Sequence, residues 1–403
     1  MTGEPRPTLF ENLRALPAPA WVLFAGTFVN RFGTFVMPFL VLYLTRGGYS
    51  DSQAGLAVGC YGLGHVAASS LGGYLADRFG RRNTIALSMF GSTVAMLSLS
   101  QARGYFVILL LSFVAGLFAE LYRPASNALI ADLVPPERRI TAYGMYRFAV
   151  NLGFAAGPAT AGFLADRSFF YVFVGDAVTS LGYGIIALAF LPHGLRTSMR
   201  GERPGEALRA AARDRRFLLF LLGTALVTSV DFQMGSTFAL HVKAHGFPGS
   251  TYGLLVSFNG VLIVLFELMI TAWTQRSQPQ VMIALGYLLT GIGFALTGLA
   301  HTIPALAATV VIWTMGEMVS SPVTGAYVSH LAPEHLRGRY HGLWVLMWSI
   351  GMVVGPTLGT WVFERNPGAL WVGCGVLGIV SAGLIILSAA KDQRSPHDDR
   401  RHE

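Results

Sequence analysis

Nine ionisable side chains interrupt stretches of the sequence that are otherwise apolar. If these stretches cross a membrane, each charge costs at least about 2.5–3.5 kcal/mol near the bilayer centre, so such residues are functional candidates. They are Arg31, His65, Glu120, Arg123, Arg147, Asp176, Asp231, Glu267 and Glu317.

The first half of the chain mixes acidic and basic groups. Glu120 and Arg123 are three residues apart and can pair on one face of a helix. Arg31 and Arg147 are predicted to join them in a polar cluster. In this cluster Glu120 could take part in proton coupling, and Arg31 and Arg123 either brace the structure or contact a substrate.

The second half has only carboxylates at such positions, and its apolar stretches contain no lysine or arginine. A carboxylate in an apolar setting without a cationic partner can take up and release protons near neutral pH. Asp231 and Glu317, each near the middle of its segment, are therefore our predicted proton or cation sites. Glu267 could act with them or serve as a structural hydrogen-bonding group.

The remaining polar residues have simpler interpretations. His65 is either a proton relay or, more commonly for a lone helical histidine, a buried hydrogen-bonding residue. Asp176 is interpreted as a solvated residue at the rim. His241 and His245 have helical i, i+4 spacing, but no third ligand lies within sequence reach, so we expect no metal site.

The elements that must position these residues are predicted to be membrane helices. The 403 residues are 53% hydrophobic and only 12% charged, with a mean hydropathy of +0.52, whereas soluble domains carry roughly 25% charge. The first apolar run is too long for a cleaved signal peptide. An all-α integral membrane fold with twelve transmembrane helices follows, over residues 19–44, 52–76, 83–101, 105–131, 140–164, 170–191, 217–241, 251–274, 280–300, 304–329, 340–363 and 368–390.

The net charge of +8 reflects topology rather than a nucleic-acid partner. Most of the 29 lysines and arginines fall in segments that share one side if the N-terminus is cytoplasmic. The positive-inside rule then places both termini in the cytoplasm. We expect a multi-pass protein of a bacterial inner membrane, with cytoplasmic tails at residues 1–18 and 391–403 and a cytoplasmic linker at residues 192–216.

The chain contains an internal repeat. A shift of 198 positions aligns Pro124 with Pro322, Arg139 with Arg337, and Gly157-Pro158 with Gly355-Pro356. Two six-helix bundles, residues 19–191 and 217–390, are therefore predicted as parallel repeats. Such repeats usually hold their substrate site between the halves near the bilayer midplane.

Two motifs resemble those of the major facilitator superfamily, and more narrowly its twelve-helix drug:proton antiporter branch. The loop from Gly73 to Arg82 is similar to motif A of that family, and residues 153–162 in the fifth helix resemble its antiporter motif C. The matching positions are Gly73, Asp77, Arg78, Gly80 and Arg81 for motif A, and Gly153, Gly157, Pro158 and Gly162 for motif C. Motif B is not matched, because Ser112 stands where that motif places an arginine before Gly116.

The resemblance implies roles for these motifs. Asp77 would meet the positive end of helix eleven near Tyr340, and Arg81 would pair with Asp132. Together they would form a cytoplasmic latch that holds the two halves together in the outward-facing state and breaks when the cytoplasmic side opens. The alternative is that these arginines only determine topology. For motif C, close helix packing by small residues explains the pattern without a role in antiport.

A transporter, not an enzyme, is the expected function. The two lysines, Lys243 and Lys391, do not follow glycines, which excludes a Walker A loop. We expect proton-coupled efflux of hydrophobic or cationic small molecules, driven by the proton gradient without a cofactor, by a protein working as a monomer in the lipid bilayer. Uptake of peptides or other nutrients, and lipid or lysolipid flipping, are the alternatives. Aromatic residues could line a drug cavity: Trp313, Trp344, Trp348, Phe232 and Tyr327.

Overall fold

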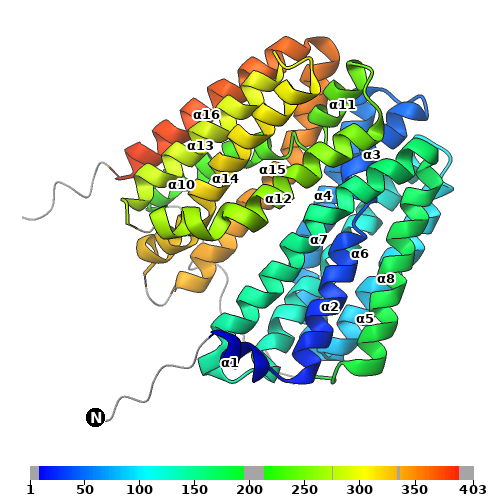
Figure 1. Cartoon of the computed structure of the whole chain (residues 1–403), viewed down its shortest axis with the longest axis vertical. Coiled ribbons are helices and arrows are strands. Elements are labelled where there is room, and N and C mark those ends of the chain that lie inside the picture. The colour runs from blue at the N-terminus through cyan, green and yellow to red at the C-terminus, as the bar shows by residue number, and fades with distance from the viewer. Residues whose placement is uncertain (1–8, 195–212, 275, 334–335, 390–403) are drawn as a thin grey trace, which may run out of the picture. The chain divides into compact units, whose positions relative to one another are not determined.

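The computed structural model describes residues 9–194, 213–274, 276–333 and 336–389, and no strand occurs within these ranges. The helices are shown in Figure 1. They are α1 (Leu9–Arg14), α2 (Ala18–Phe32), α3 (Val36–Arg46), α4 (Asp51–Phe79), α5 (Arg81–Ser100), α6 (Tyr105–Leu133), the 3-10 helix η1 (Pro136–Arg138), α7 (Arg139–Arg167), α8 (Phe169–Phe190), α10 (Arg215–Asp231), α11 (Thr237–Ala244), α12 (Gly249–Thr274), α13 (Pro279–Thr297), α14 (Ile303–Leu331), α15 (Arg337–Arg365) and α16 (Pro367–Ala389). Most of the predicted tails and linker lies outside the described residues.

Every predicted apolar segment corresponds to one helix or to a pair of helices. Ten stretches within the described residues are long and apolar enough to cross a membrane, and the bent helix α4 gives an eleventh. One such pair forms the segment predicted over residues 217–241. It is not one continuous helix but two, α10 with 17 residues and α11 with 8. The first helix is also interrupted, at residues 33–35 between α2 and α3.

Polar side chains define several helix starts. Asp214 Oδ1 accepts hydrogen bonds from the backbone N–H groups of Arg216 and Phe217 at the start of α10. Ser168 and Thr302 cap α8 and α14 in the same way. Each cap satisfies N–H groups that have no partner within the helix. Gly80, before α5, has φ of 91°, a backbone conformation that favours glycine.

Two compact units make up the chain. The first comprises Met1–Tyr43, Cys60–Arg200 and Phe247–Gly260, and the second comprises Leu44–Gly59, Gly201–Gly246 and Val261–Glu403. They follow the two predicted bundles except at residues 44–59 and 247–260, which are exchanged between them.

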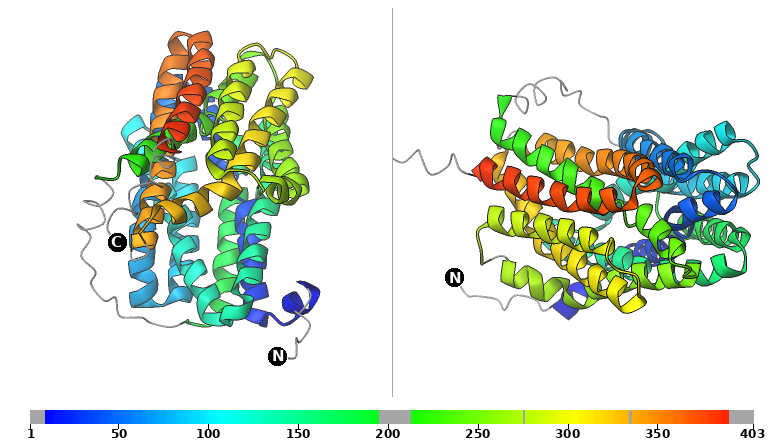
Figure 2. Two further views of the ribbon diagram at one scale, coloured as in Figure 1. Left: turned by 90° about the vertical axis from the view of Figure 1, so that its left-hand side faces the viewer. Right: turned by 90° about the horizontal axis from the view of Figure 1, so that it is seen from above.

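Each unit has its own apolar core. In the first unit, α2 packs on α7 and α8, and α5 packs on α6 and α8. In the second unit, α10 packs along α15 and α16, and α13 packs along α14 and α16, as two further views show (Figure 2).

Each exchanged segment is tied to its unit by a carboxylate. In the first unit, Asp166 Oδ2 accepts a hydrogen bond from Ser250 N, 3.1 Å away, at the start of α12. In the second unit, Glu364 Oε2 accepts one from Ser52 N, 2.9 Å away, at the start of α4. Both acceptors meet the positive end of a helix dipole. The two pairs occupy equivalent positions of the 198-residue repeat.

Candidate functional site

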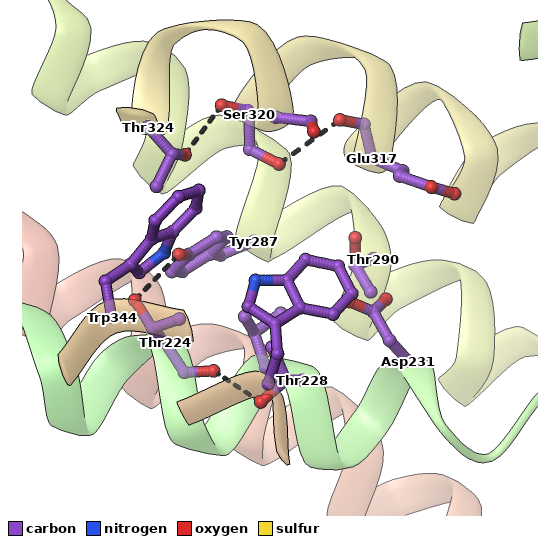
Figure 3. A pocket seen from close by; sticks show the side chains of 12 residues that line it. Thr224, Thr228, Asp231, Tyr287, Thr290, Glu317, Ser320, Thr324 and Trp344 are labelled. Atoms are coloured by element: carbon purple, nitrogen blue, oxygen red, sulfur yellow. Dashed lines mark hydrogen bonds between the residues drawn. The ribbon is translucent and has the colours of Figure 1, made fainter. Parts of the chain in front are cut away.

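A pocket in the second unit contains both predicted proton sites. Asp231 at the end of α10 and Glu317 in the middle of α14 line it together with hydroxyl groups and two tryptophans (Figure 3). No lysine, arginine or histidine belongs to the described lining of this pocket. The remaining lining residues are Thr224, Val227, Thr228, Tyr287, Thr290, Ser320, Ser321, Thr324, Trp344 and Trp348.

The two carboxylates are grouped within the pocket. Figure 3 shows Asp231, Thr290 and Glu317 towards one end and Trp344 towards the other. Asp231 and Glu317 thus share one pocket, with their side chains at the same end of it. Like charges at close range make the site favour a proton or another cation between them.

The prediction from sequence that Asp231 lies near the middle of a helix is wrong. Asp231 is the last residue of α10, and residues 232–236 form turns before α11 begins. The prediction was wrong because hydropathy continues across the break, whereas the hydrogen-bonding pattern does not. The backbone N–H of Gln233 bonds to Val230 O instead of to Ser229 O four residues earlier.

Gln233 stabilises this break, although this residue was not among those predicted from sequence to be functional. Its side-chain Nε2 donates to Ser229 O at 2.9 Å, replacing the lost helical bond, and to Gly355 O at 2.8 Å. Its Oε1 accepts from Thr237 Oγ1 at 2.8 Å. Gly359 on α15 leaves room for the amide, since a Cβ there would lie 2.2 Å from Oε1. The signal available in the sequence was a glutamine inside an otherwise apolar segment.

The predicted aromatic residues divide between lining and packing. Trp344 and Trp348 line the pocket, and the ring of Phe232 contacts Trp348 edge-on at 6.3 Å between centroids. Trp313 instead packs in the core against Phe238 and Phe294. Tyr327 is also buried, with its hydroxyl 3.1 Å from that of Ser388.

A second charged cluster lies in the first unit around Glu120. The predicted pair with Arg123 is formed at 2.7 Å, and Arg31 lies 3.3 Å from the same carboxylate. His65 Nδ1 is 3.8 Å away, so this histidine belongs to the cluster. Two further candidates have other positions: Arg147 is exposed on α7, and Glu267 is half-buried on α12 outside the pocket lining.

Asp176 is a buried helix cap and not a solvated rim residue. Only 4% of its surface is exposed. Its Oδ2 accepts hydrogen bonds from the backbone N–H groups of Phe35 and Val36, both at 3.1 Å. These groups begin α3 after the interruption at residues 33–35. The rim interpretation was wrong because the sequence did not show that the first helix is broken.

Motif A forms a compact ionic turn within the first unit. Arg81 lies 3.0 Å from Asp77 and 3.1 Å from Asp132, which confirms the predicted pair with Asp132. Its backbone N–H also donates to His193 O at 3.1 Å. Arg78 instead donates to Tyr74 Oη at 2.6 Å. Nothing lies within 4 Å of the position that a Cβ on Gly73 would take. The contact of Asp77 with the helix that begins near Tyr340 stays a prediction.

The glycines of motif C let helices pack closely, as predicted from their small size and spacing. A Cβ on Gly153 would lie 2.8 Å from Phe32 N, and one on Gly157 would lie 2.5 Å from Phe32 O. Gly162 has the same relation to Gly249 O, at 2.7 Å. Pro158 lies inside α7 without ending it. These glycines let α2 and the start of α12 approach the backbone of α7.

Apolar helices of this number and length define a multi-pass membrane protein. Sequence comparison identifies the family within this class to which the chain belongs. The sequence profile of the Major Facilitator Superfamily matches residues 23–248 and 221–403. The chain belongs to this superfamily of transporters.

Curated relatives cover most of the chain. An uncharacterised MFS-type transporter of Bacillus subtilis, YqjV, is 29% identical over 84% of this chain and 85% of its own length. A Na(+), Li(+), K(+)/H(+) antiporter of Planococcus maritimus is 25% identical over 90% of this chain and 91% of its own. The quinolone resistance protein NorA of Staphylococcus aureus is 22% identical over 93% and 97%.

Solved structures share the fold. A POT family transporter crystallised with 5-aminolevulinic acid superposes with a TM-score of 0.79 at 18% identity, covering 93% of this chain and 96% of that one. A bacterial homologue of the human lysosomal transporter Spinster gives 0.71 at 18% identity, covering 92% and 94%. At these identities the likeness concerns the fold alone.

Proposed function

We propose that this protein is a proton-coupled antiporter that exports hydrophobic, cationic small molecules by alternating access. The observation that carries the proposal is the pocket of the second unit, where Asp231 and Glu317 lie together among hydroxyl groups and two tryptophans. The same carboxylates can hold either protons or a positively charged substrate. Exchange of one for the other is antiport.

The composition of the pocket suits a lipophilic cation. The carboxylates supply negative charge, and Trp344 and Trp348 offer aromatic faces on which a cation can lie. Threonine and serine hydroxyls around them can donate or accept hydrogen bonds without fixing one substrate shape. A site of this kind selects charge and hydrophobicity more strongly than exact structure.

The cluster around Glu120 has a different charge balance. Arg31 and Arg123 both pair with that carboxylate, so its negative charge is already compensated within the first unit. We assign the cluster to bracing α2 against α6. In this proposal the proton that drives transport is bound in the second unit.

Monovalent cation/proton antiport is the second candidate. Two carboxylates beside hydroxyl oxygens also provide the oxygen ligands that a small hard cation prefers. The relative from Planococcus maritimus is named for that activity. The two candidates share their site and their proton coupling, and differ in whether the tryptophans are used.

The test is flux in proteoliposomes under an imposed pH gradient. Native protein is compared with Glu317→Gln and Asp231→Asn, and Glu137→Gln serves as a control because Glu137 is exposed in η1. We expect a lipophilic fluorescent cation to move against protons with native protein and control, and either pocket variant to lose that coupling.

Other outcomes separate the alternatives. Exchange of Na⁺ or K⁺ with protons, but not of the dye, would support the second candidate. Transport of a dipeptide or a lysolipid alone would overturn both. Normal proton-coupled flux in both pocket variants would move the proton site away from Asp231 and Glu317.

A further inference from the structure

Three histidines meet at one end of the second unit, outside the pocket. His241 lies in α11, His245 follows its last residue, and His301 lies in the connection between α13 and α14. One ring nitrogen of each lies within 4.8 Å of the others. His301 Nδ1 is 2.7 Å from His245 Nε2, although 56 residues separate the two in sequence. The third ligand that sequence spacing did not supply is therefore present in the fold.

Backbone carbonyls set the tautomers of two of these rings. His245 Nδ1 lies 2.8 Å from His241 O, and His241 Nε2 lies 3.0 Å from Ala300 O. A carbonyl oxygen only accepts, so both of these nitrogens carry hydrogen. The lone pairs are then on Nε2 of His245 and Nδ1 of His241. Metal-binding histidines are typically oriented in this way by a carbonyl on the second ring nitrogen.

The surroundings combine a buried side with an open one. His241 is buried, and its ring meets that of Trp371 edge-on at 5.3 Å. His245 is half-buried, and His301 is exposed. Ring centroids of His245 are 4.3 Å from His241 and 4.8 Å from His301. The exposed ring of His301 gives an ion access to the cluster from solvent, which would also supply water as a fourth ligand.

We propose that His241, His245 and His301 form a binding site for a divalent transition-metal ion of the zinc class. Three imidazoles with an open fourth position match a common zinc coordination, with Zn–N distances of about 2.0–2.1 Å. Tetrahedral geometry brings ligand nitrogens to roughly 3.3 Å from one another, a spacing that modest side-chain rotation can reach. Magnesium and calcium are disfavoured because they prefer oxygen ligands.

The site has a structural consequence for the proposed transport pocket. α11 is joined to Asp231 only through the turns of residues 232–236. A bound ion would hold α11 to the α13–α14 connection. Nevertheless, none of the three histidines lines the pocket, so metal binding does not depend on the proposed function.

The test measures zinc binding to purified protein that carries no histidine tag. Native protein is titrated with Zn²⁺ by calorimetry, and bound metal is counted by elemental analysis after dialysis. His245→Ala and His301→Ala are the test variants, and His330→Ala is the control because His330 is exposed elsewhere on α14. We expect one Zn²⁺ per chain in native protein and control, and affinity lower by on the order of 100-fold in each test variant.

Thermal unfolding gives a second measurement that does not depend on detecting the ion. Zn²⁺ should raise the melting temperature of native protein and of Asp231→Asn, since an ion that binds only the folded state stabilises it. It should not raise that of His301→Ala, whereas Mg²⁺ should affect none of them. Equal zinc affinity in native protein and both test variants, or no saturable binding to native protein, would overturn the proposal.

Discussion

Glu120 is the residue on which the charge balance of the first unit depends. Its carboxylate lies 3.3 Å from Arg31 and 2.7 Å from Arg123. The side chain of Arg31 is only 19% exposed, and that of Glu120 only 8%. Charges in such places are tolerated because they are paired, and the removal of one leaves the other uncompensated.

We expect Glu120→Gln to lower the free energy of unfolding by about 3 kcal/mol, because Arg31 would then face a neutral amide. Thermal or denaturant unfolding in detergent measures the change. Glu137→Gln, the same substitution at an exposed position, should leave stability within about 0.5 kcal/mol of the native value. Equal stability of the two variants would show that the cluster is not a structural brace.

Residue pairs were predictable from sequence only where spacing is local or a motif supplies the partner. The Glu120–Arg123 pair follows from helical geometry, and the Arg81–Asp132 pair from the family motif. The roles of Asp176 and Gln233 depend on backbone groups exposed by helix breaks that composition does not reveal. His301 reaches His245 only because the chain folds back over two helices.

Close approach of α7 to α2 is the element-scale feature with the clearest mutational signature. At Gly157 the position of a Cβ lies 2.5 Å from a backbone oxygen of α2, too short for any real contact. Gly144, on the same helix, has nothing within 4 Å of the corresponding position. The two glycines therefore differ in environment while sharing a helix.

We expect Gly157→Ala to destabilise the protein by about 1–3 kcal/mol, because the added methyl group forces backbones apart. Gly144→Ala should be neutral or stabilise by up to about 1 kcal/mol, since alanine is the better helix former. Melting temperatures of the two variants in the same detergent provide the comparison. Similar destabilisation by both would mean that glycine flexibility, and not packing, is what α7 requires.

Helix positions were predictable because an apolar run of membrane length can form little other than a membrane helix. Whether each helix is continuous was not predictable. Both breaks, at residues 33–35 and 232–236, lie inside segments that hydropathy alone predicts as single membrane helices. Continuity depends on which carbonyl each N–H reaches, and that is decided by side chains such as Gln233 that supply substitute bonds.

At the scale of the whole molecule, the distribution of basic residues predicts orientation. The connection between α6 and α7 is expected on the cytoplasmic side, and the connection between α5 and α6 on the opposite side. In protein with Cys60 and Cys374 replaced by alanine, a membrane-impermeant maleimide should label Gln101→Cys in intact cells. Glu137→Cys should react only after the cells are opened. The reverse pattern would invert the topology and with it the predicted direction of transport.

The all-α architecture and the superfamily were recoverable from sequence because hydropathy, the 198-residue repeat and motif A agree. The candidate pocket was recoverable in part. Asp231 and Glu317 were selected as carboxylates in apolar segments without lysine or arginine, and Trp344 and Trp348 as cavity aromatics. All four line one pocket. Its hydroxyl-bearing residues were not selected, since serine and threonine inside membrane helices usually bond to their own backbone.

The two helix breaks are satisfied by different residues in the two halves of the chain. They fall at equivalent positions of the repeat, but the counterpart of Asp176 is Cys374 and the counterpart of Gln233 is Phe35. One half satisfies its broken helix with a carboxylate from α8, and the other with an amide from the broken helix itself. Corresponding interruptions of the helix therefore depend on different side chains in the two halves. Backbone groups freed at equivalent breaks can thus be satisfied by a carboxylate in one half and by an amide in the other.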